Sequence, residues 1–439
     1  MKTEKIPIHL LHSAIVGLLV GLLTALFRMA VESAESVRRS YLDSVSISEL
    51  SSFLPWLLLS ISLAALAAWL TARFAPEAAG SGIPHIKAVL KGNQSLHWLR
   101  VLAVKFSAGL VSIGAGLSLG KEGPSVQMGA AVGAALGKGV DAPILPHRNL
   151  ISVGAAAGLA SIFNAPLAGF TFALEELRRD LSFITYSSTF IAVLSADIVT
   201  RHIFSQDALF SLPQYPVASL RAFPVCIVVG LLCGFCGVLF SRSIFAGRKF
   251  FQSLHAWPVA CRAALVGILC AFVACSVPYA LGSGDDVVQK LLSGNPIPLS
   301  ISALALLLLA KYILTVCSFT CGVPGGIFAP MLLLGALIGL ISGQADQVLF
   351  HTSDPPLGVY AIVGMVAFFT AVVRTPITAI VLVTEMTNTY TQLLMLMLGA
   401  IAAFLVAEWF REEPIYDHLE KAIFEQSAAQ EEKTNRARE

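Results

Sequence analysis

Three glycine-rich segments interrupt the apolar runs of this sequence in a way that suits anion binding. They are GSGIP (80–84), GKEGP (120–124) and GVPGGIFAP (322–330), and each precedes or opens an apolar helix. Glycine lets the backbone approach a ligand closely, and proline fits a first helical turn, where its missing N–H is not needed. The remaining free N–H groups and the positive end of the helix dipole hold an anion without lysine or arginine. One such break is more often a kink, but three in one chain favour a binding site.

The second break contains a carboxylate, Glu122. An ionised carboxylate inside an apolar, membrane-embedded region is costly, so such a residue is a functional hypothesis by default. A deprotonated Glu122 is itself an anion and competes with a halide for the same N–H groups, whereas protonation removes this competition. The residue therefore predicts that a proton and an anion are coupled at one site.

Two segments in the first part of the sequence are each similar to a segment in the second part, and the matches occur in the same order. Residues 154–177 align with residues 364–387 at an offset of 210, and residues 120–137 align with residues 322–339 at an offset of 202. The protein is therefore expected to consist of two homologous halves, and transporters with this plan place their site at the interface between the repeats. Hydropathy leaves open whether the second half is inverted.

We place the first half at residues 1–210 and the second at residues 211–416. A polar tail, residues 417–439, follows and is too short to be a regulatory domain. The apolar run from Leu10 to Val31 is too long for the core of a signal peptide, and we interpret it as a retained first span.

The repeat divides the candidate acids into those with an acidic counterpart in the other half and those without one. Glu175 aligns with Glu385, which indicates a scaffold role, whereas Glu176 falls opposite Met386 and Glu122 falls opposite Pro324 in the alignment above. Acids that only one half carries are the better candidates for chemistry that one half performs alone. Six other ionisable residues in apolar runs are expected to form buried pairs or helix-end anchors: Lys105, Asp197, Arg262, Lys311, Arg374 and Glu408.

The elements that position these residues are predicted to be membrane helices. Of the 439 residues, 56% are hydrophobic and 13% are charged, against about a quarter charged in soluble domains. The apolar residues suffice for on the order of a dozen spans of about 20 residues. Short glycine-rich runs near 124–137 and 326–343 predict helices that begin inside the protein, which is tolerated where they line a cavity.

Cysteine, histidine and net charge give no sign of an enzyme or of nucleic-acid binding. The eight cysteines are interpreted as buried thiols, although Cys233 and Cys236 form a CxxC in an apolar run. No cluster of potential ligands surrounds His85, so we expect neither a metal nor a cofactor. A net charge of +2 provides no basic field for nucleic acid.

The three segments resemble the signature segments of the CLC family of chloride channels and chloride/proton exchangers. The run that follows the second segment is similar as well, and the resemblance extends from about residue 15 to Tyr416. It implies an all-α integral membrane protein of two inverted-topology homologous halves, with tilted, broken and partly spanning helices. It also implies a homodimer, with one ion path in each subunit, in the inner (plasma) membrane of a prokaryote.

The resemblance also implies a chloride site. Ser81 resembles the serine whose hydroxyl contacts the central anion, and Tyr416 resembles the tyrosine that contacts it from the cytoplasmic side. The backbone N–H groups of Ile327 and Phe328 complete the expected site, with Gly123 of the second segment beside them. A serine in the first segment favours chloride over nitrate.

Two glutamates carry over as proton-handling residues. Glu122 matches the external gating glutamate, and Glu176 matches the internal proton-transfer glutamate that exchangers have and channels generally lack. The expected function is therefore secondary active exchange of chloride against protons moving in the opposite direction. Two positions depart from the family pattern: Lys121 replaces a frequent arginine and loses its bidentate fork, and His85 replaces a frequent acidic residue.

Two alternatives remain at this point. A passive gated chloride channel of the same fold requires Glu122 to act only as a gate and Glu176 to be idle. An intramembrane aspartyl protease is formally suggested by GSGD (282–285) and the pair Tyr416-Asp417. Such proteases carry the YD pair first and both aspartates within spans, so we expect this alternative to fail.

Overall fold

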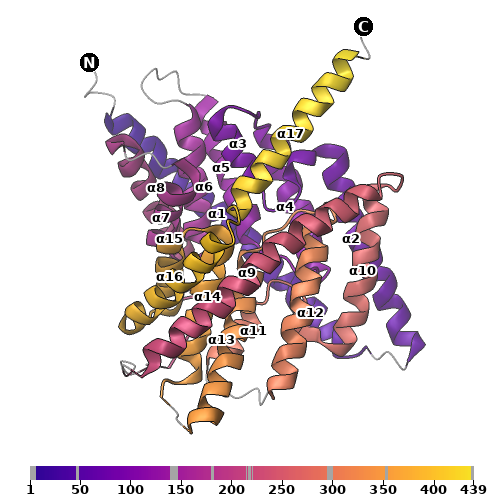
Figure 1. Ribbon diagram of the computed structural model, residues 1–439. Helices are drawn as coiled ribbons and strands as arrows, with labels where there is room; N and C mark the ends of the chain where they lie inside the picture. The colour runs from indigo at the N-terminus through magenta and orange to yellow at the C-terminus, as the bar shows by residue number, and fades with distance from the viewer. Residues whose placement is uncertain are drawn as a thin grey trace.

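The computed structural model describes residues 6–45, 49–138, 147–178, 182–213, 215, 219, 221–293, 300–351 and 354–436. Within these residues the regular structure is helical, with α-helices α1 to α17 and short turns η1 to η4, and β-pairing is limited to two isolated bridges. The predicted all-α fold is confirmed (Figure 1).

The chain runs twice through the same order of elements. The first set is α1 (Ile6–Leu42), α2 (Leu50–Phe74), η1 (Pro76–Ala78), α3 (Ile83–Lys91), α4 (Trp98–Gly114), α5 (Glu122–Lys138), α6 (His147–Phe163), α7 (Pro166–Phe172), η2 (Ala173–Arg178) and α8 (Phe183–Ile203). The second set is α9 (Ala222–Ser253), α10 (Val259–Ser276), η3 (Pro278–Ala280), α11 (Asp285–Leu292), α12 (Ile301–Thr320), α13 (Phe328–Phe350), α14 (Leu357–Val373), α15 (Pro376–Thr387), η4 (Tyr390–Gln392) and α16 (Leu393–Trp409). A final helix, α17 (Ile415–Arg436), follows them.

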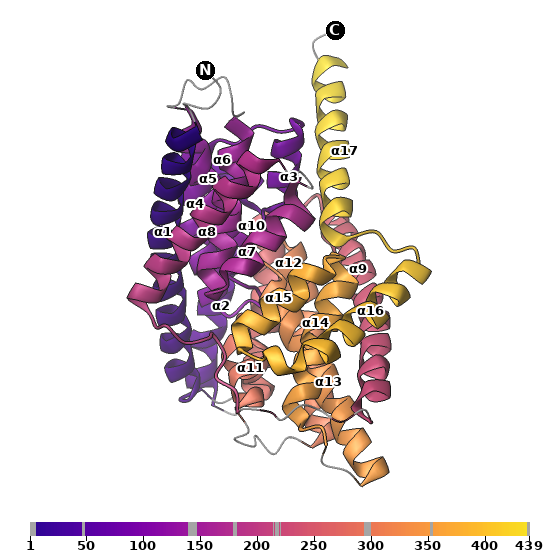
Figure 2. The same ribbon diagram turned by 90° about the vertical axis from the view of Figure 1, so that its left-hand side faces the viewer.

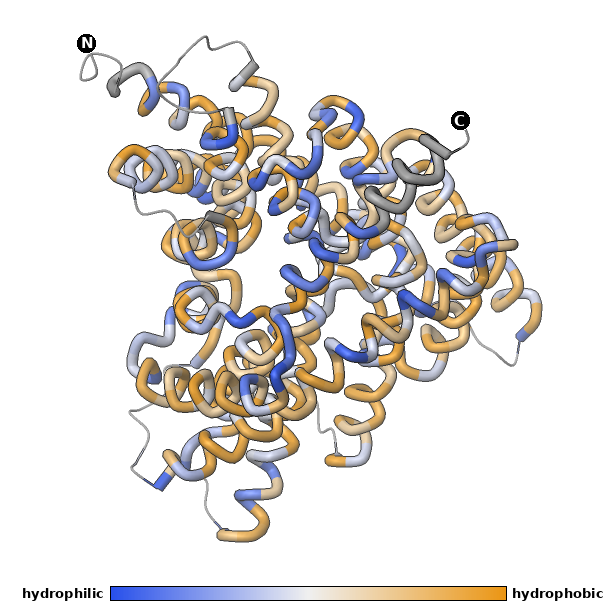
Figure 3. Tube along the Cα trace, turned by 45° about the horizontal axis from the view of Figure 1, so that its top comes forward, coloured by the Kyte–Doolittle hydropathy of each residue, from blue (hydrophilic) through white to orange (hydrophobic). Residues whose placement is uncertain are grey.

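Eight of the described helices are long and apolar enough to cross a membrane. Large apolar side chains on α1, α2 and α9 are half exposed, and hydrophobic residues predominate along most helices in Figure 3. A bundle with such a surface uses lipid as its solvent. The expected helices that begin inside the protein are also present, because Glu122 and Phe328, which begin α5 and α13, are both fully buried.

Glycine pairs allow the central helices of each half to touch. A Cβ atom on Gly129 of α5 would lie 2.1 Å from the carbonyl oxygen of Gly154 on α6. In the second half, a Cβ atom on Gly335 of α13 would lie 2.2 Å from the carbonyl oxygen of Gly364 on α14. Small residues at such crossings are what membrane helices use to pack closely.

These contacts correct one of the two predicted alignments. Gly129 and Gly335 make equivalent contacts and differ by 206 positions rather than 202. Gly120 and Gly326, also 206 apart, exchange both backbone hydrogen bonds at 2.8 and 2.7 Å. The predicted alignment is shifted by four residues. This shift is close to one helical turn of about 3.6 residues, so the shifted alignment superimposes the same helix face and most of the same glycines. Glu122 therefore has Phe328, not Pro324, as its counterpart.

The two halves exchange equivalent contacts in both directions. The Glu385 carboxylate accepts hydrogen bonds from the backbone of Leu167 and Ala168, at 3.1 and 2.8 Å, at the start of α7. Glu175 does the same at the start of α15, where Ile377 and Thr378 donate at 3.3 and 2.8 Å. Both acids cap a helix of the other half, which agrees with the scaffold role expected for Glu175.

Reciprocal contacts of this kind indicate a two-fold relation between the halves. The first helices of the two halves run in opposite directions: α1 leads away from the end of the molecule where the N-terminus lies, and α9 leads toward that end (Figures 1 and 2). The halves are therefore inverted, as the family resemblance implies.

A third repeat match escaped the sequence comparison. Gly282-Ser283-Gly284 has the left-handed glycines of Gly80-Ser81-Gly82, with φ of 66° and 94° against 64° and 86°. Lys105 donates to the carbonyls of Ala78 and Gly80 at 2.9 and 2.7 Å, and Lys311 donates to those of Ala280 and Gly282 at 3.3 and 2.7 Å. Both lysines were expected to be paired or to anchor helix ends, but they bind the carbonyls of these turns instead.

This match also removes the basis of the protease alternative. The GSGD segment is the repeat counterpart of the first glycine-rich break, not a catalytic loop. Its Asp285 pairs with Lys121, whereas Asp417 pairs with Lys87 in a different part of the molecule. The two aspartates do not share a site.

Replacing Gly335 with alanine is expected to destabilise the fold. The new methyl group would overlap the Gly364 carbonyl, and overpacking of this kind costs about 1–3 kcal/mol. Thermal unfolding of the detergent-purified protein measures the effect. Gly109→Ala is the matched control, because a Cβ atom there meets Phe27 at an ordinary 3.4 Å. Equal melting temperatures for the two variants would contradict the prediction.

Candidate functional site

The three glycine-rich breaks meet in the middle of the bundle. Gly80 donates to the carbonyl of Val323 at 2.9 Å, and Gly325 donates back to the Gly80 carbonyl at 3.0 Å. The pair Gly120 and Gly326 joins the second break to the third. The starts of α3, α5 and α13 are therefore held together by backbone hydrogen bonds in one buried region, and the first N–H groups of each helix have no carbonyl partner within their own helix.

Ser81 lies at this junction. Its side chain is 1% exposed and sits two residues before the start of α3. A Cβ atom on Gly123 would lie 2.7 Å from the Ser81 hydroxyl oxygen, so the second break packs directly on the first. This contact explains the glycine at position 123, since any side chain there would displace Ser81.

Tyr416 reaches the same junction from the other end of the chain. It is the second residue of α17 and is fully buried, and its ring stacks on that of Phe328 with centroids 6.0 Å apart. Its hydroxyl faces that of Ser81 but does not reach hydrogen-bonding geometry with any partner among the described residues. An unpartnered buried hydroxyl is uncommon and indicates a place for a ligand.

The Glu122 carboxylate is fully buried beside these groups. The backbone N–H of Ala329 in α13 faces it, yet neither carboxylate oxygen reaches hydrogen-bonding geometry with a described residue. A Cβ atom on Gly326 would lie 3.3 Å from Glu122 Oε2. The carboxylate thus occupies a pocket of bare backbone in which a larger residue at 326 would crowd it.

The structure therefore brings together all of the predicted chloride-binding residues and Glu122. Ile327 and Phe328 form the buried start of α13, and Phe328 contacts Tyr416. The family resemblance implied these residues from three separate motifs and a distant tyrosine, and the backbone pairing of the breaks is what assembles them.

Glu176 lies apart from this junction, in the π-helical turn η2. It is 3% exposed and pairs with Lys87 of α3 at 2.5 Å, and the same lysine pairs with Asp417, the residue after Tyr416. The sequence reasoning missed Lys87. The sequence did contain a signal for Lys87. It lies about one turn into α3, in the segment IPHIK, where a lysine points to the interior together with the buried residues of that helix.

Two clefts approach these groups on different faces of α17. One, of about 320 Å³, reaches Ser81 and is lined by His85 and Arg248, with Leu419 and Ile423 from α17. The other, of about 630 Å³, reaches Glu176 and Lys87 and is lined by Asp417, Glu420 and Phe424 of α17. The helix thus separates an approach to the anion junction from an approach to Glu176.

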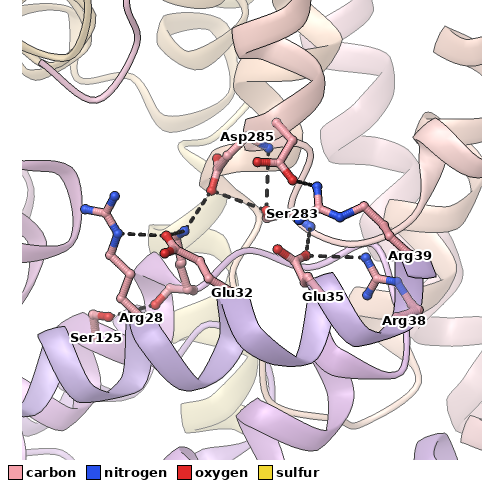
Figure 4. A network of polar contacts seen from close by, with 10 residues as sticks. Arg28, Glu32, Glu35, Arg38, Arg39, Ser125, Ser283 and Asp285 are labelled. Atoms are coloured by element: carbon pink, nitrogen blue, oxygen red, sulfur yellow. Dashed lines mark hydrogen bonds and ion pairs between the residues drawn. The ribbon is translucent and has the colours of Figure 1, made fainter. Parts of the chain in front are cut away.

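A network of charged residues lies on the other side of Glu122. Lys121 is 3% exposed, and its ammonium group contacts Glu32 of α1 at 3.1 Å and Asp285 of α11 at 3.2 Å. Arg28 holds Glu32 at 2.7 Å. Figure 4 shows Glu32 on α1 facing Asp285 across the gap between the two helices.

Metal ligation finds no support in the described residues. They contain no group of three or more His, Cys, Asp or Glu side chains placed to hold a metal ion. All eight cysteines lie in the described part of the chain and are free thiols, but Cys261 is exposed, contrary to the prediction that all are buried.

The comparisons with known proteins agree with this geometry. The family model described as voltage gated chloride channel, the CLC model, matches residues 63–408. The chain belongs to the CLC family. The H(+)/Cl(-) exchange transporter ClcA of Vibrio parahaemolyticus is 39% identical over 420 residues, which cover 93% of this chain and 88% of that protein. Its counterpart from Vibrio cholerae is 38% identical over 434 residues, covering 95% of this chain and 90% of that protein.

Solved structures place the fold in the same family. A CLC structure described as a slow cyanobacterial Cl−/H+ antiporter superimposes with a TM-score of 0.89 at 34% identity, covering 95% of this chain and 98% of that one. A CLC-type fluoride/proton antiporter superimposes with a TM-score of 0.78 at 22% identity, covering 92% of this chain and 96% of that one, and shows a shared fold.

Proposed function

We propose that this CLC protein is a secondary active transporter that exchanges chloride for protons moving in the opposite direction. The observation that carries the proposal is the buried Glu122 carboxylate, whose oxygens reach hydrogen-bonding geometry with none of the described residues and which lies beside the Ser81 and Tyr416 hydroxyls at three converging helix starts. The relatives named as H(+)/Cl(-) exchange transporters support it at 38 and 39% identity.

Chloride would be held by neutral groups at this junction. The hydroxyls of Ser81 and Tyr416 donate to the ion, and the N–H groups of Gly123, Ile327 and Phe328 contribute the positive ends of α5 and α13. Such a site has no formal positive charge of its own, so chloride binds and leaves without breaking an ion pair. Deprotonated Glu122 competes for the same groups, and protonated Glu122 releases them.

Protons would follow a separate route on one side of the junction. Glu176 is buried at the end of a cleft that chloride does not need to enter, and Lys87 holds its charged form. Glu176 then exchanges protons with the cytoplasmic solution and with Glu122. A passive channel of the same fold would need no such second acid.

The remaining parts of the proposal concern the assembly. Chloride and protons are the substrates, and no cofactor, metal or nucleic acid takes part. The protein is proposed to act as a multi-pass homodimer in the inner (plasma) membrane, with a complete ion path in each subunit. It is proposed to be a transporter without enzymatic activity.

Purified protein in liposomes tests this function. A chloride gradient should drive protons uphill, in the direction opposite to chloride, and a pH electrode outside the vesicles records the movement. Chloride flux without proton movement would identify the channel alternative. Empty liposomes give the proton leak. A proton ionophore added at the end of each trace gives the full scale of the pH signal.

Replacing Gly123 with alanine is expected to weaken chloride binding by about tenfold, which corresponds to about 1.4 kcal/mol. The added methyl group would lie 2.7 Å from the Ser81 hydroxyl oxygen and 2.8 Å from the Ser81 carbonyl oxygen, so the serine must move away from the ion. Isothermal titration with chloride measures the affinity. Wild-type affinity in a correctly folded Gly123→Ala protein would argue against the site.

A further inference from the structure

Lys121 is the basic residue next to Glu122 in the chain, yet its charge is used elsewhere. Its ammonium group is bound by two carboxylates, Glu32 at 3.1 Å and Asp285 at 3.2 Å. Lys121 is 3% exposed and the Asp285 side chain is 14% exposed, so solvent screens their contact little, whereas the Glu32 side chain is 40% exposed. The natural counterion for a deprotonated Glu122 is thus already neutralised. We call the three residues Glu32, Lys121 and Asp285 the carboxylate clamp.

The clamp is fixed from three elements of the structure. Glu32 comes from α1 and is held by Arg28 at 2.7 Å. Asp285 begins α11 and accepts a hydrogen bond from the Ser283 hydroxyl at 3.2 Å. Figure 4 shows both acids, with Arg28 and Ser283 as their supports. A lysine held in this way does not swing toward Glu122 without breaking two ion pairs.

Several elements carry charged and titratable side chains toward the region of Glu122. They are Arg28, Glu32 and Glu35 on α1, His85 and Lys87 on α3, Lys105 on α4, Lys121 before α5, Asp285 on α11 and Tyr416 on α17. Lys105 binds two backbone carbonyls, and Lys87 binds Glu176 and Asp417. Two of these charges act directly on Glu122: the repulsion from Asp285 is the larger, and the attraction from Lys121 offsets it only in part.

For a deprotonated Glu122, moving out of the anion junction toward α11 is therefore electrostatically unfavourable. In that direction it approaches the negative charge of Asp285, and the adjacent cation, Lys121, is shared between two other carboxylates. A protonated Glu122 carries no charge and does not feel this repulsion. The arrangement penalises the departure of Glu122 only in its charged form.

We propose that the carboxylate clamp limits the attraction of Lys121 for Glu122 to less than the repulsion from Asp285, and thereby keeps the deprotonated gate in the anion junction until a proton arrives. Glu32 and Asp285 are then positioning residues that act through Lys121 and set how strictly chloride movement depends on protonation. This inference rests on the proposed exchange function and adds residues that enforce its coupling.

Neutralising the clamp tests the inference in proteoliposomes. In Asp285→Asn, and more strongly in Asp285→Asn with Glu32→Gln, Lys121 becomes free to bind a deprotonated Glu122 outside the junction. The number of chloride ions moved per proton should rise severalfold, on the order of five. Chloride flux should also fall less steeply between acidic and neutral pH than in the wild type. Asp286→Asn is the matched control, because that neighbouring carboxylate pairs with Arg39 and not with Lys121.

The outcomes separate the inference from the proposed function. If the wild type moves no protons, the exchange function fails. If the wild type is coupled and both clamp variants keep its stoichiometry and pH profile while remaining folded, the exchange function stands and the inference is wrong. Thermal unfolding and gel filtration identify a variant that fails to fold, and Glu32→Gln alone then provides the second test. A crystal structure of Asp285→Asn should show the Glu122 carboxylate within ion-pair distance of Lys121.

Discussion

Glu122→Gln is expected to abolish uphill proton movement while chloride continues to cross the membrane. Glutamine has nearly the same size as glutamate but carries neither the charge nor the exchangeable proton. The anion junction then has no internal competitor, and chloride transport no longer waits for protonation. Proton flux driven by a chloride gradient should fall by at least about a hundredfold, the scale of losing a positioned acid or base.

Simultaneous pH and chloride electrodes on the same proteoliposomes make this measurement. Glu408→Gln is a suitable control, because Glu408 is a largely exposed carboxylate that pairs with Arg374 away from the junction. Proton uptake at the wild-type rate in Glu122→Gln would show that this carboxylate does not couple the two ions. Loss of chloride flux in the variant would show instead that Glu122 is needed to shape the anion site.

Glu176→Gln is expected to remove proton flux by a different route. The variant leaves the anion junction and Glu122 intact but removes the acid that we propose connects Glu122 with the cleft beside α17. Proton movement should fall by at least about tenfold while chloride flux persists. The fold should survive, because Lys87 keeps its contact with Asp417 when Glu176 becomes neutral.

The control for Glu176 is another acid in the same cleft. Glu420 lines that cleft and pairs with Lys91, so Glu420→Gln should keep both fluxes. If Glu176→Gln remains fully coupled, protons reach Glu122 by another path and the assignment of Glu176 is refuted. Comparing the two acid variants also distinguishes the roles of the acids, since only Glu122→Gln should change how chloride binds.

The internal repeat shows what comparing the sequence with itself detected and what it missed. The match that pairs Glu175 with Glu385 was in register, and both residues cap helices of the opposite half. The match through the second break was shifted by four residues, because one helical turn restores the pattern of small and apolar residues. The GSG segment at 282–284 was noted only for its formal fit to a protease motif and was not recognised as the repeat counterpart of residues 80–82, since the residues around the two segments differ.

Position 122 illustrates what the corrected register changes. Its counterpart is Phe328, so one half supplies the ionisable carboxylate and the other supplies the ring that stacks on Tyr416. Glu122 was predicted as an acid that one half carries alone, and this holds in the corrected alignment. The asymmetry of the site is therefore built from equivalent positions at two equivalent helix starts.

Composition, spacing and glycine placement were enough to predict a helical membrane protein with duplicated halves and an anion site at its glycine-rich breaks, and the family resemblance implied the individual residues of the anion junction. These are local properties: the energy of burying apolar side chains and the freedom of glycine at a helix start depend on short stretches of chain. The convergence of the three breaks, the pairing of Lys87 with Glu176 and the carboxylate clamp around Lys121 depended on tertiary structure. Each of them joins residues that are dozens to hundreds of positions apart, and an ion pair leaves no periodic trace in a sequence that would reveal its partner.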